Sequence, residues 1–340
     1  MKQSEHITID DVSQIAGVSK TTVSRYLNQR YEHMSEKTKD KIKKVIEELE
    51  FRPNLIARNL KSQKTGLIGV IVSDVANPVT VHLIKGIIDH CTKEGYQVIT
   101  ASSDEKIARE KEYILSMVDR QVEGLIISIV DYNKFDLLQT LSQKGVKIVL
   151  ADRTISQPVL DTVTTDNYEM TKYAIKKLYE IGFDAVALFS SDLLRSNVRL
   201  HRYNAFIEES KNHVQNPNAL AYLFTQDMEG EYRKTLTEFV DSHKGQKIAA
   251  FASTPMALQN LLGAAQDLGI SIPEDIGVCG YDNLPWTKLV CGGISVIEQP
   301  FYEVGVESAK MLIEKIRGES EKSPDYKELK SKLILRNSTS

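Results

Sequence analysis

The sequence lacks the long apolar stretches and the cysteine patterns that mark membrane proteins and disulfide-stabilised proteins. No run reaches the roughly 18 to 20 apolar residues that a membrane span needs, and the polar N-terminus has no apolar signal-peptide core. The three cysteines, Cys91, Cys279 and Cys291, show no C-x-x-C spacing and indicate neither a disulfide framework nor a thiolate metal site. We therefore expect a cytoplasmic protein with no membrane partner.

The sequence also lacks the motifs of common enzyme chemistries. It has no G-x-x-x-x-G-K-[ST] phosphate loop, no G-x-G-x-x-G after its first predicted strand, no G-x-S-x-G and no H-E-x-x-H. The seven histidines are scattered, and such lone residues are usually core or surface histidines rather than ligands. We expect no enzyme activity, no catalytic residues, no cofactor and no metal site.

The 340 residues, 41% of them hydrophobic and 26% charged, fit a globular chain of two or three domains. Residues 1–64 hold 13 Lys and Arg against 9 Asp and Glu, a net charge of +4, whereas the remaining 276 hold 30 against 37, a net charge of −7. A basic head on an acidic body is typical of a small nucleic-acid-binding domain joined to a larger one, provided that a motif supports it.

Residues 8–53 predict three short helices. Thr8 can cap a helix at 9–16 that ends before Gly17, Ser19 can cap a helix at 20–27, and a third helix runs from Ser35 to about residue 51 before Pro53. On the second helix, Val23 and Leu27 share one face, and the opposite face carries Lys20, Thr21, Ser24 and Arg25. Helix, glycine turn and capped helix form a helix-turn-helix pattern, which places its second helix in the DNA major groove.

From Gly66 onward, short β-branched runs alternate with helical runs, a pattern typical of parallel β-α-β units. The predicted strands are 67–72, 97–101, 124–129, 147–150, 185–189, 248–252, 276–279 and 294–297. The predicted helices are 79–94, 108–120, 136–144, 168–181, 198–212, 230–242, 256–268 and 304–316. So many units need two sheets, and we expect two doubly wound α/β subdomains with a ligand cleft where their strand ends meet.

Residues 11–28 carry the string D-V-x-x-x-A-G-V-S-x-x-T-V-S-R-x-L-N and closely resemble the DNA-binding head of the LacI/GalR family of transcriptional regulators. The resemblance continues through 52–60 (R-P-N-L-I-A-R-N-L), Asn77-Pro78, Asp166-Asn167 and 280–283 (G-Y-D-N), and covers nearly the whole chain. It departs at 28–35, which is about one residue longer than in well-known members. Within the family, 19–28 and 286–289 resemble regulators of 2-keto-3-deoxygluconate use.

The resemblance implies a fold, domain bounds and an oligomeric state. The fold is an N-terminal all-α helix-turn-helix head plus an α/β periplasmic-binding-protein-like body of two doubly wound parallel-sheet subdomains. The implied domains are the head at 1–53, a hinge helix and linker at 54–65, and an effector-binding and dimerisation body at 66–340. The two subdomains would be about 66–165 plus 298–328 and about 166–297 plus 329–340. A homodimer would match a pseudo-palindromic DNA operator.

The resemblance also implies DNA contacts. Lys20 and Thr21 correspond to the base-reading pair, Arg25 to a base contact, and Thr22 and Ser24 to phosphate contacts. The other implied DNA-binding residues are Thr8, Asn28, Ala57 and Leu60. Leu60 corresponds to a leucine wedged between base pairs by a hinge helix that forms on DNA. The alternative for 54–65 is an ordinary linker, although Ala57 and Leu60 at i, i+3 favour a transient helix.

Effector residues follow in the same way. Arg195, Arg199 and Arg202, spaced four and three apart, can share one helix face, and Arg153 follows another strand. An arginine fork suits a carboxylate or phosphate, so these residues would suit an anionic effector. The alternative for Arg195 and Arg199 is a solvated basic face. The effector residues implied by the resemblance are Ser73, Val79, Asp166, Arg199, Arg202, Ser253 and Asp282. Where sugar-binding members carry aromatic residues after Asn-Pro, this chain has Val79-Thr80, and where they carry Asn-Asp it has Ser253-Thr254. A wall with fewer aromatic residues favours an acyclic ligand such as a sugar acid over a stacked sugar ring.

These features predict a sequence-specific DNA-binding transcriptional regulator, a repressor of carbohydrate or sugar-acid genes controlled by a small-molecule effector. A solute-binding protein is the alternative for the body alone, but the basic head and the polar N-terminus count against it. A cytoplasmic enzyme is a third possibility without a catalytic motif. The sequence leaves open whether the effector releases DNA or promotes its binding.

Overall fold

The structure, a computed structural model, describes residues 7–51, 65–224, 229–319 and 324–340. The chain divides into two compact units, Met1–Thr65 and Gly66–Ser340. We call the first unit the head and the second the body. In the part of the chain described, no helix is both long and apolar enough to cross a membrane.

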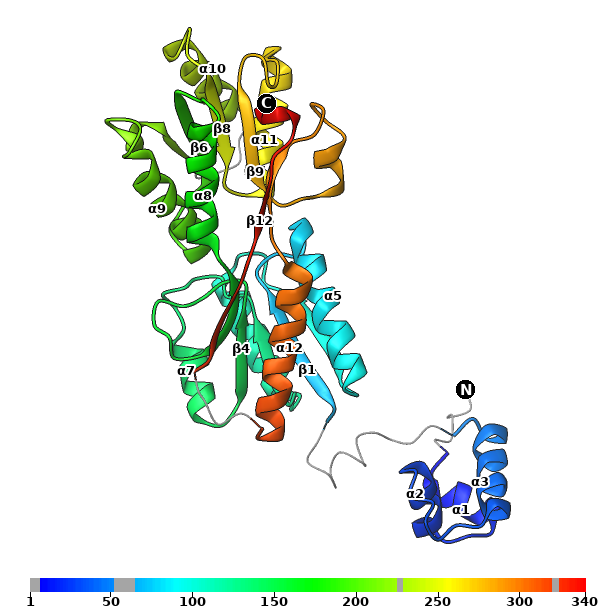
Figure 1. The fold of residues 1–340 in the computed structure, drawn as a ribbon. Coiled ribbons are helices and arrows are strands. Elements are labelled where there is room, and N and C mark those ends of the chain that lie inside the picture. Colours follow the sequence, from blue (N-terminus) through cyan, green and yellow to red (C-terminus); the bar gives the residue numbers. More distant parts are fainter. Residues whose placement is uncertain (1–6, 52–64, 225–228, 320–323) are drawn as a thin grey trace. The chain divides into compact units, whose positions relative to one another are not determined.

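The head consists of three helices, α1 (Ile9–Ala16), α2 (Lys20–Leu27) and α3 (Glu36–Glu48) (Figure 1). Side chains of Thr8, Ser19 and Ser35 cap them, and Gly17 ends α1 in the left-handed conformation, with φ 58°. All four were expected. The helices enclose a small core of Val12, Ala16, Val23, Ile42, Val45 and Phe51. The third helix is shorter than predicted, because the backbone turns left-handed at Glu50, with φ 49°.

The body contains two six-stranded sheets, one in each subdomain. The first has the order β11-β5-β4-β3-β1-β2, and all of its strands are parallel. Its strands are β1 (Leu67–Val72), β2 (Gln97–Ser102), β3 (Gly124–Ile127), β4 (Lys147–Ala151), β5 (Asp161–Thr165) and β11 (Tyr326–Leu329). Its helices are α5 (Pro78–Lys93), α6 (Ile107–Asp119), α7 (Asp136–Gln143) and α12 (Phe301–Arg317).

The second sheet has the order β12-β10-β9-β8-β6-β7. Its strands are β6 (Ala185–Ser191), β7 (Ala221–Phe224), β8 (Ile248–Ala252), β9 (Gly277–Tyr281), β10 (Ser295–Glu298) and β12 (Lys332–Ile334). Its helices are α8 (Asn167–Glu180), α9 (Asn197–Ser210), α10 (Glu229–Ser242) and α11 (Pro255–Leu268). Short 3-10 turns lie at Pro217–Leu220, Pro285–Lys288 and Asn337–Thr339. A wholly parallel sheet was expected here, but β12 runs antiparallel to β10.

The sequence pattern located every α-helix of the body and eight of its strands, but it missed β5, β7, β11 and β12. The last three lie at sheet edges, where one side of the strand has no neighbour and a long apolar run is not required. β5 is buried yet reads Asp-Thr-Val-Thr-Thr, so its polar residues concealed it. Left-handed glycines follow five of the helices, at 95, 145, 182, 269 and 318.

In the first subdomain, α5 and α12 lie side by side against the sheet, at very close range (Figure 1). Gly86 and Gly305 permit this approach. A Cβ atom on Gly86 would lie 2.1 Å from the carbonyl oxygen of Tyr302, and one on Gly305 would lie 2.2 Å from that of Leu83. Because backbone atoms cannot yield as a flexible side chain can, these positions require glycine.

The chain passes between the subdomains three times, between β5 and α8, between β10 and α12, and between β11 and β12. These crossings are hydrogen-bonded to one another. The Thr165 hydroxyl donates to Gln299 Oε1 at 2.7 Å, and the Ser331 N–H donates to Asp166 Oδ1 at 2.9 Å. These bonds connect the β5–α8 crossing to each of the other two.

Candidate DNA-binding and effector sites

The face of α2 that points away from the head's core carries the expected DNA contacts. Val23 is fully buried and holds α2 against the core. Ser24 is partly exposed, and the exposed side chains are those of Lys20, Thr21, Arg25 and Asn28. Hydroxyl groups and an arginine at helical spacing are suited to base edges and phosphates in a major groove.

Two of these residues already have partners within the head. Lys20 Nζ forms an ion pair with Asp10 of α1. The Thr22 hydroxyl lies 2.9 Å from Ser19 Oγ, which also accepts the Thr22 N–H at 3.1 Å. Lys20 must leave Asp10 to reach a base, and the Thr22 hydroxyl takes part in the cap of α2.

Thr8 and Asn28 also stabilise helix ends. Thr8 forms a reciprocal capping box with Asp11, whose carboxylate accepts the Thr8 N–H at 2.7 Å. This bond lowers the pKa of Asp11 below its usual range. Asn28 donates its side-chain amide to the Ser24 carbonyl at 2.8 Å. The expected hinge residues Ala57 and Leu60 lie outside the described residues.

A cavity of about 420 Å³ lies at the junction of the two subdomains. We call it the cleft. Val79 of α5 lines it from the first subdomain and Asp282, directly after β9, from the second, and Gln299 of the β10–α12 crossing lies on its wall. The structure thus brings together two expected effector residues, together with a glutamine that the sequence analysis did not single out.

Arg202 of α9 lies in this region, 3% exposed. Its Nε and Nη2 donate to Asn167 Oδ1 at 2.9 and 2.7 Å, its Nη1 donates to the Ser253 carbonyl at 2.5 Å, and its Nη2 also donates to Gln299 Oε1 at 3.0 Å. The guanidinium carbon lies 3.4 Å from the Tyr281 ring centroid. Protein acceptors therefore occupy most of the fork that was expected to grip an anion.

Gln299 connects Arg202 to Asp282. Its Nε2 donates to Asp282 Oδ1 at 2.7 Å, and its Oε1 accepts from Arg202 and from Thr165. Burial raises the pKa of Asp282 to about 6, although Arg202 and Gln299 oppose the shift. Asp282 has a left-handed backbone, with φ 75°, which is uncommon outside glycine and asparagine.

Asp152 is a second carboxyl group of this region that the sequence analysis missed. It directly follows β4 with φ 67°, and burial raises its pKa. The charge of Asp152 raises the pKa of Asp282, and the charge of Arg202 lowers the pKa of Asp152. The three groups therefore lie within electrostatic reach of one another. Its position directly after a predicted strand could have identified it, because ligands bind where parallel strands end.

The remaining expected effector residues are distributed around the junction. Asp166 is 3% exposed, accepts the Ser331 N–H, and its Oδ2 lies 3.7 Å from Lys330 Nζ. Its carboxylate therefore binds the β11–β12 crossing. Ser253 donates its hydroxyl to Ser190 at 2.7 Å and its carbonyl receives Arg202. Ser73 is buried after β1, and its carbonyl accepts the Glu105 N–H at 2.8 Å. Arg199 is partly buried, and its charge lowers the pKa of Glu105.

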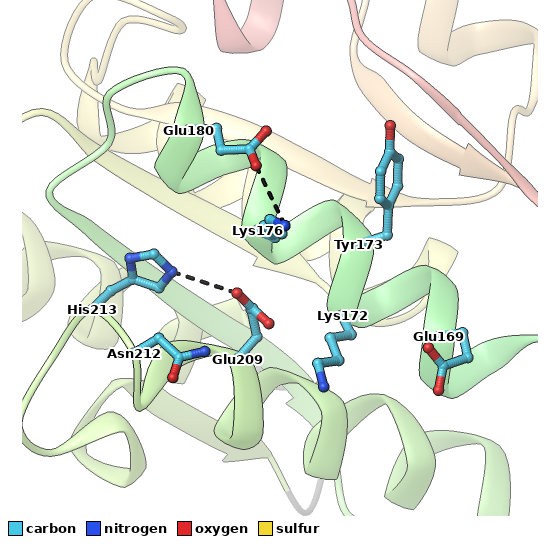
Figure 2. A pocket seen from close by; sticks show the side chains of 8 residues that line it. All are labelled: Glu169, Lys172, Tyr173, Lys176, Glu180, Glu209, Asn212 and His213. Atoms are coloured by element: carbon cyan, nitrogen blue, oxygen red, sulfur yellow. Dashed lines mark ion pairs between the residues drawn. The ribbon is translucent and has the colours of Figure 1, made fainter.

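A second, larger groove of about 640 Å³ lies on the surface of the second subdomain, between α8 and α9 (Figure 2). Two of its ion pairs, His213 with Glu209 at 3.5 Å and Lys176 with Glu180 at 3.7 Å, each join residues of its own rim. Its residues are mostly charged and mostly exposed, and no expected effector residue lines it. The cleft is the better candidate, because its lining comes from both subdomains and includes the buried polar side chains of Asp282 and Gln299.

A helix-turn-helix head with an exposed arginine and hydroxyl face, on one chain with a two-sheet body that holds a polar cleft, defines a DNA-binding transcriptional regulator. Residues 8–54 match the family described as bacterial regulatory proteins, lacI family, and residues 175–339 match the periplasmic binding protein-like domain.

Full-length relatives agree. The chain is 35% identical over 339 residues to the HTH-type transcriptional regulator KdgR of Bacillus subtilis (strain 168), with 99% of both chains covered. It is 32% identical over 346 residues to the probable HTH-type transcriptional regulator EndR of Paenibacillus polymyxa, covering 97% of this chain and 95% of that one. The chain belongs to the LacI family, and the predicted family is confirmed.

The predicted fold class is confirmed as well. The crystal structure of the lac repressor dimer bound to operator and the anti-inducer ONPF superimposes with a TM-score of 0.86. The match has 22% sequence identity and covers 98% of this chain and 99% of that chain. At this identity the likeness concerns the fold.

Proposed function

We propose that this regulator is a cytoplasmic repressor of carbohydrate or sugar-acid genes, which binds a pseudo-palindromic operator as a homodimer and responds to a small effector in the cleft. It acts by binding rather than by catalysis. The observation that carries the proposal is the network of Arg202, Gln299 and Asp282, which joins the cleft to the crossings.

The effector's hydroxyl groups would donate to Asp282 and Asp152, in place of the amide that Gln299 now donates. Gln299 also accepts from Thr165 and Arg202, so its displacement would disturb two crossings at once. Because each subdomain is a packed unit, the strain would be relieved by a movement of one subdomain against the other. That movement is the step by which effector binding would change DNA affinity.

The effector class is proposed from the cleft's composition. Val79 and Thr80 stand where a stacking aromatic ring would favour a cyclic sugar. The resemblance to regulators of 2-keto-3-deoxygluconate use points in the same direction, to an acyclic sugar acid. Arg202 would hold the network in place and offer its remaining N–H to the ligand.

The hinge at 54–65 would complete DNA binding. We expect Leu60 to wedge between base pairs beside Ala57, and Leu60→Ala to weaken operator binding and reduce DNA bending. A circular-permutation bending assay would measure the bend angle. Unchanged affinity and bending would show that this residue makes no wedge.

A thermal-shift screen of sugars, sugar phosphates and sugar acids, followed by operator-binding titrations with each hit, tests the proposal. A ligand at 100 times its dissociation constant adds about 2.7 kcal/mol of stability. The expected hit is a sugar acid that also changes operator affinity. A ligand that stabilises the protein without changing operator affinity would contradict the proposed control.

A further inference from the structure

Arg153 follows β4 at the junction of the subdomains and lies outside the network of Arg202. The residue before it, Asp152, is within electrostatic reach of Arg202 and Asp282. The residue after it, Thr154, donates its N–H to Asn197 Oδ1 of the second subdomain at 3.2 Å. Arg153 is therefore held between two residues that both face the other subdomain.

Glu105 binds the Arg153 fork at both prongs. Arg153 Nη2 donates to Glu105 Oε1 at 2.5 Å and Nη1 donates to Oε2 at 3.1 Å, a two-bond geometry in which a carboxylate fills the guanidinium edge. Arg153 Nη1 also donates to the Ile129 carbonyl at 3.3 Å. The charges of Arg199 and Arg195, from the second subdomain, also act on Glu105 and lower its pKa.

The two partners differ in exposure. The Arg153 side chain is 12% exposed, whereas that of Glu105 is 41% exposed. Glu105 can therefore turn into water and be solvated there, but Arg153 cannot. If Glu105 left without replacement, a buried guanidinium would lose its carboxylate, which is strongly unfavourable. The geometry thus permits exchange of one carboxylate for another, rather than simple opening.

Other charged groups adjoin this position. The charges of Asp152 and Glu110 act on Arg153, and burial raises the pKa of Glu110 to about 7. Glu110 accepts the Val130 N–H at 2.7 Å, so it is directed at the backbone. Glu105 is the carboxylate that holds the Arg153 fork among the described residues.

We propose that Arg153 is the carboxylate-binding subsite of the effector cleft, that Glu105 occupies this subsite in the absence of effector, and that an acidic effector binds by displacing Glu105. This inference rests on the proposed function, which places an acidic effector at the junction. It assigns the ligand's charge to Arg153 and leaves its hydroxyls to Asp282 and Asp152. The effector's carboxylate would then exchange with an internal one.

Glu105→Gln separates this proposal from a merely structural ion pair. Gln keeps the size and one acceptor for Arg153 but carries no charge, so it should compete poorly with an acid. Calorimetry with 2-keto-3-deoxygluconate, gluconate and the neutral sorbitol should show about tenfold tighter binding of the acids to this variant, with sorbitol unchanged. Arg153→Lys, which keeps the charge but loses the fork, should bind the acids more weakly than wild type.

Asp104→Asn is the matched control. Asp104 adjoins Glu105 but pairs with the exposed Arg109, so its loss should leave acid affinity unchanged. Acids that bind wild type but bind Glu105→Gln no better would overturn the exchange and leave the effector-controlled repressor standing. If neither acid binds either protein while a neutral sugar releases DNA, the acid subsite is wrong and the regulator remains. Thermal melts of each variant verify that it is folded.

Discussion

The face of α2 that is expected to read DNA and the cleft that is proposed to bind the effector present similar residue types in opposite ways. On α2, Thr21 and Arg25 are exposed on a convex surface. At the cleft, Asp282 and the neighbouring Arg202 are 4% and 3% exposed and are bonded to other protein groups. A duplex is large enough to cover exposed donors, whereas a small ligand must be enclosed. On the proposed function, DNA binding would depend on surface charge, and effector binding would depend on exchange within a satisfied network.

The largest effect is expected from Asp282→Ala, which tests whether the cleft network binds the effector. Removal of the carboxylate leaves Gln299 and the ligand's hydroxyls without a buried acceptor, which should weaken effector binding by about 3 kcal/mol. Operator binding without effector should be unchanged. Calorimetry and operator titrations measure both quantities.

Asp267→Ala is the control for that experiment, because Asp267 is an exposed carboxylate of the same subdomain that pairs with Arg233. It should leave effector affinity unchanged. Wild-type effector affinity in the Asp282→Ala protein would show that the ligand binds elsewhere, with the α8–α9 groove of Figure 2 as the next place to examine.

Arg25→Ala tests the opposite side of the comparison. If Arg25 reaches a base edge, its loss should cost about 1 to 3 kcal/mol on operator DNA and much less on random DNA. Effector affinity should stay at the wild-type value. Fluorescence anisotropy with both duplexes gives the ratio, and an equal loss on the two would make Arg25 a phosphate contact.

The same contrast explains what the sequence could predict. The helices of the head follow from local signals, since Thr8, Ser19 and Ser35 cap them and Gly17 ends the first. In the body, the aliphatic strands were found. The buried β5 was missed because its Thr and Asp residues resemble a loop, and burial depends on neighbouring strands that sequence periodicity does not reveal.

Site prediction divides in a similar way. The DNA-reading residues lie on one contiguous helix, so their common face followed from helical spacing. Asp282 was identified only through the family resemblance, which also strengthened the choice of Arg202 from its helical spacing. Gln299, Asp152 and Glu105 were missed because their partners come from distant segments that meet only in the folded chain.

Glu110→Gln tests how far a buried carboxylate differs from an exposed one. Burial raises the pKa of Glu110 to about 7, so the folded protein holds this proton more tightly than the unfolded chain does. Wild-type stability should therefore fall as pH rises from about 4.5 to 7. The variant removes this loss and should be more stable than wild type by about 2 kcal/mol at pH 8, with no gain at pH 4.

Denaturant titrations followed by Trp286 fluorescence measure this difference. The chain has 1 tryptophan, and it packs against the cores of the body, so the signal reports the body alone. Gln retains an acceptor for the Val130 N–H. A variant that is less stable at pH 8 would show that the charged form is favourable in the fold.

A smaller effect is expected from pH on effector binding. Because burial raises the pKa of Asp282 to about 6, its carboxylate becomes protonated as pH falls below this value and accepts hydroxyl bonds less well. Burial also raises the pKa of Asp152, which should add to the loss. Effector affinity should fall about tenfold between pH 7 and pH 5, or about 1.4 kcal/mol. Calorimetry at several pH values checks this, and a flat profile would remove these carboxyls from the ligand's contacts.

The smallest effect is expected from Asp10→Asn in the head. Asp10 pairs with Lys20, but the two side chains are 53% and 64% exposed, so water and salt screen the pair. Loss of the acidic partner should free Lys20 for DNA and raise operator affinity only about twofold, more at low salt than at high salt. Anisotropy titrations at two salt concentrations measure it, and effector affinity should not move. Weaker operator binding would instead mean that Asp10 holds Lys20 in its reading position, so that even this exposed face depends on an internal contact, as the cleft does.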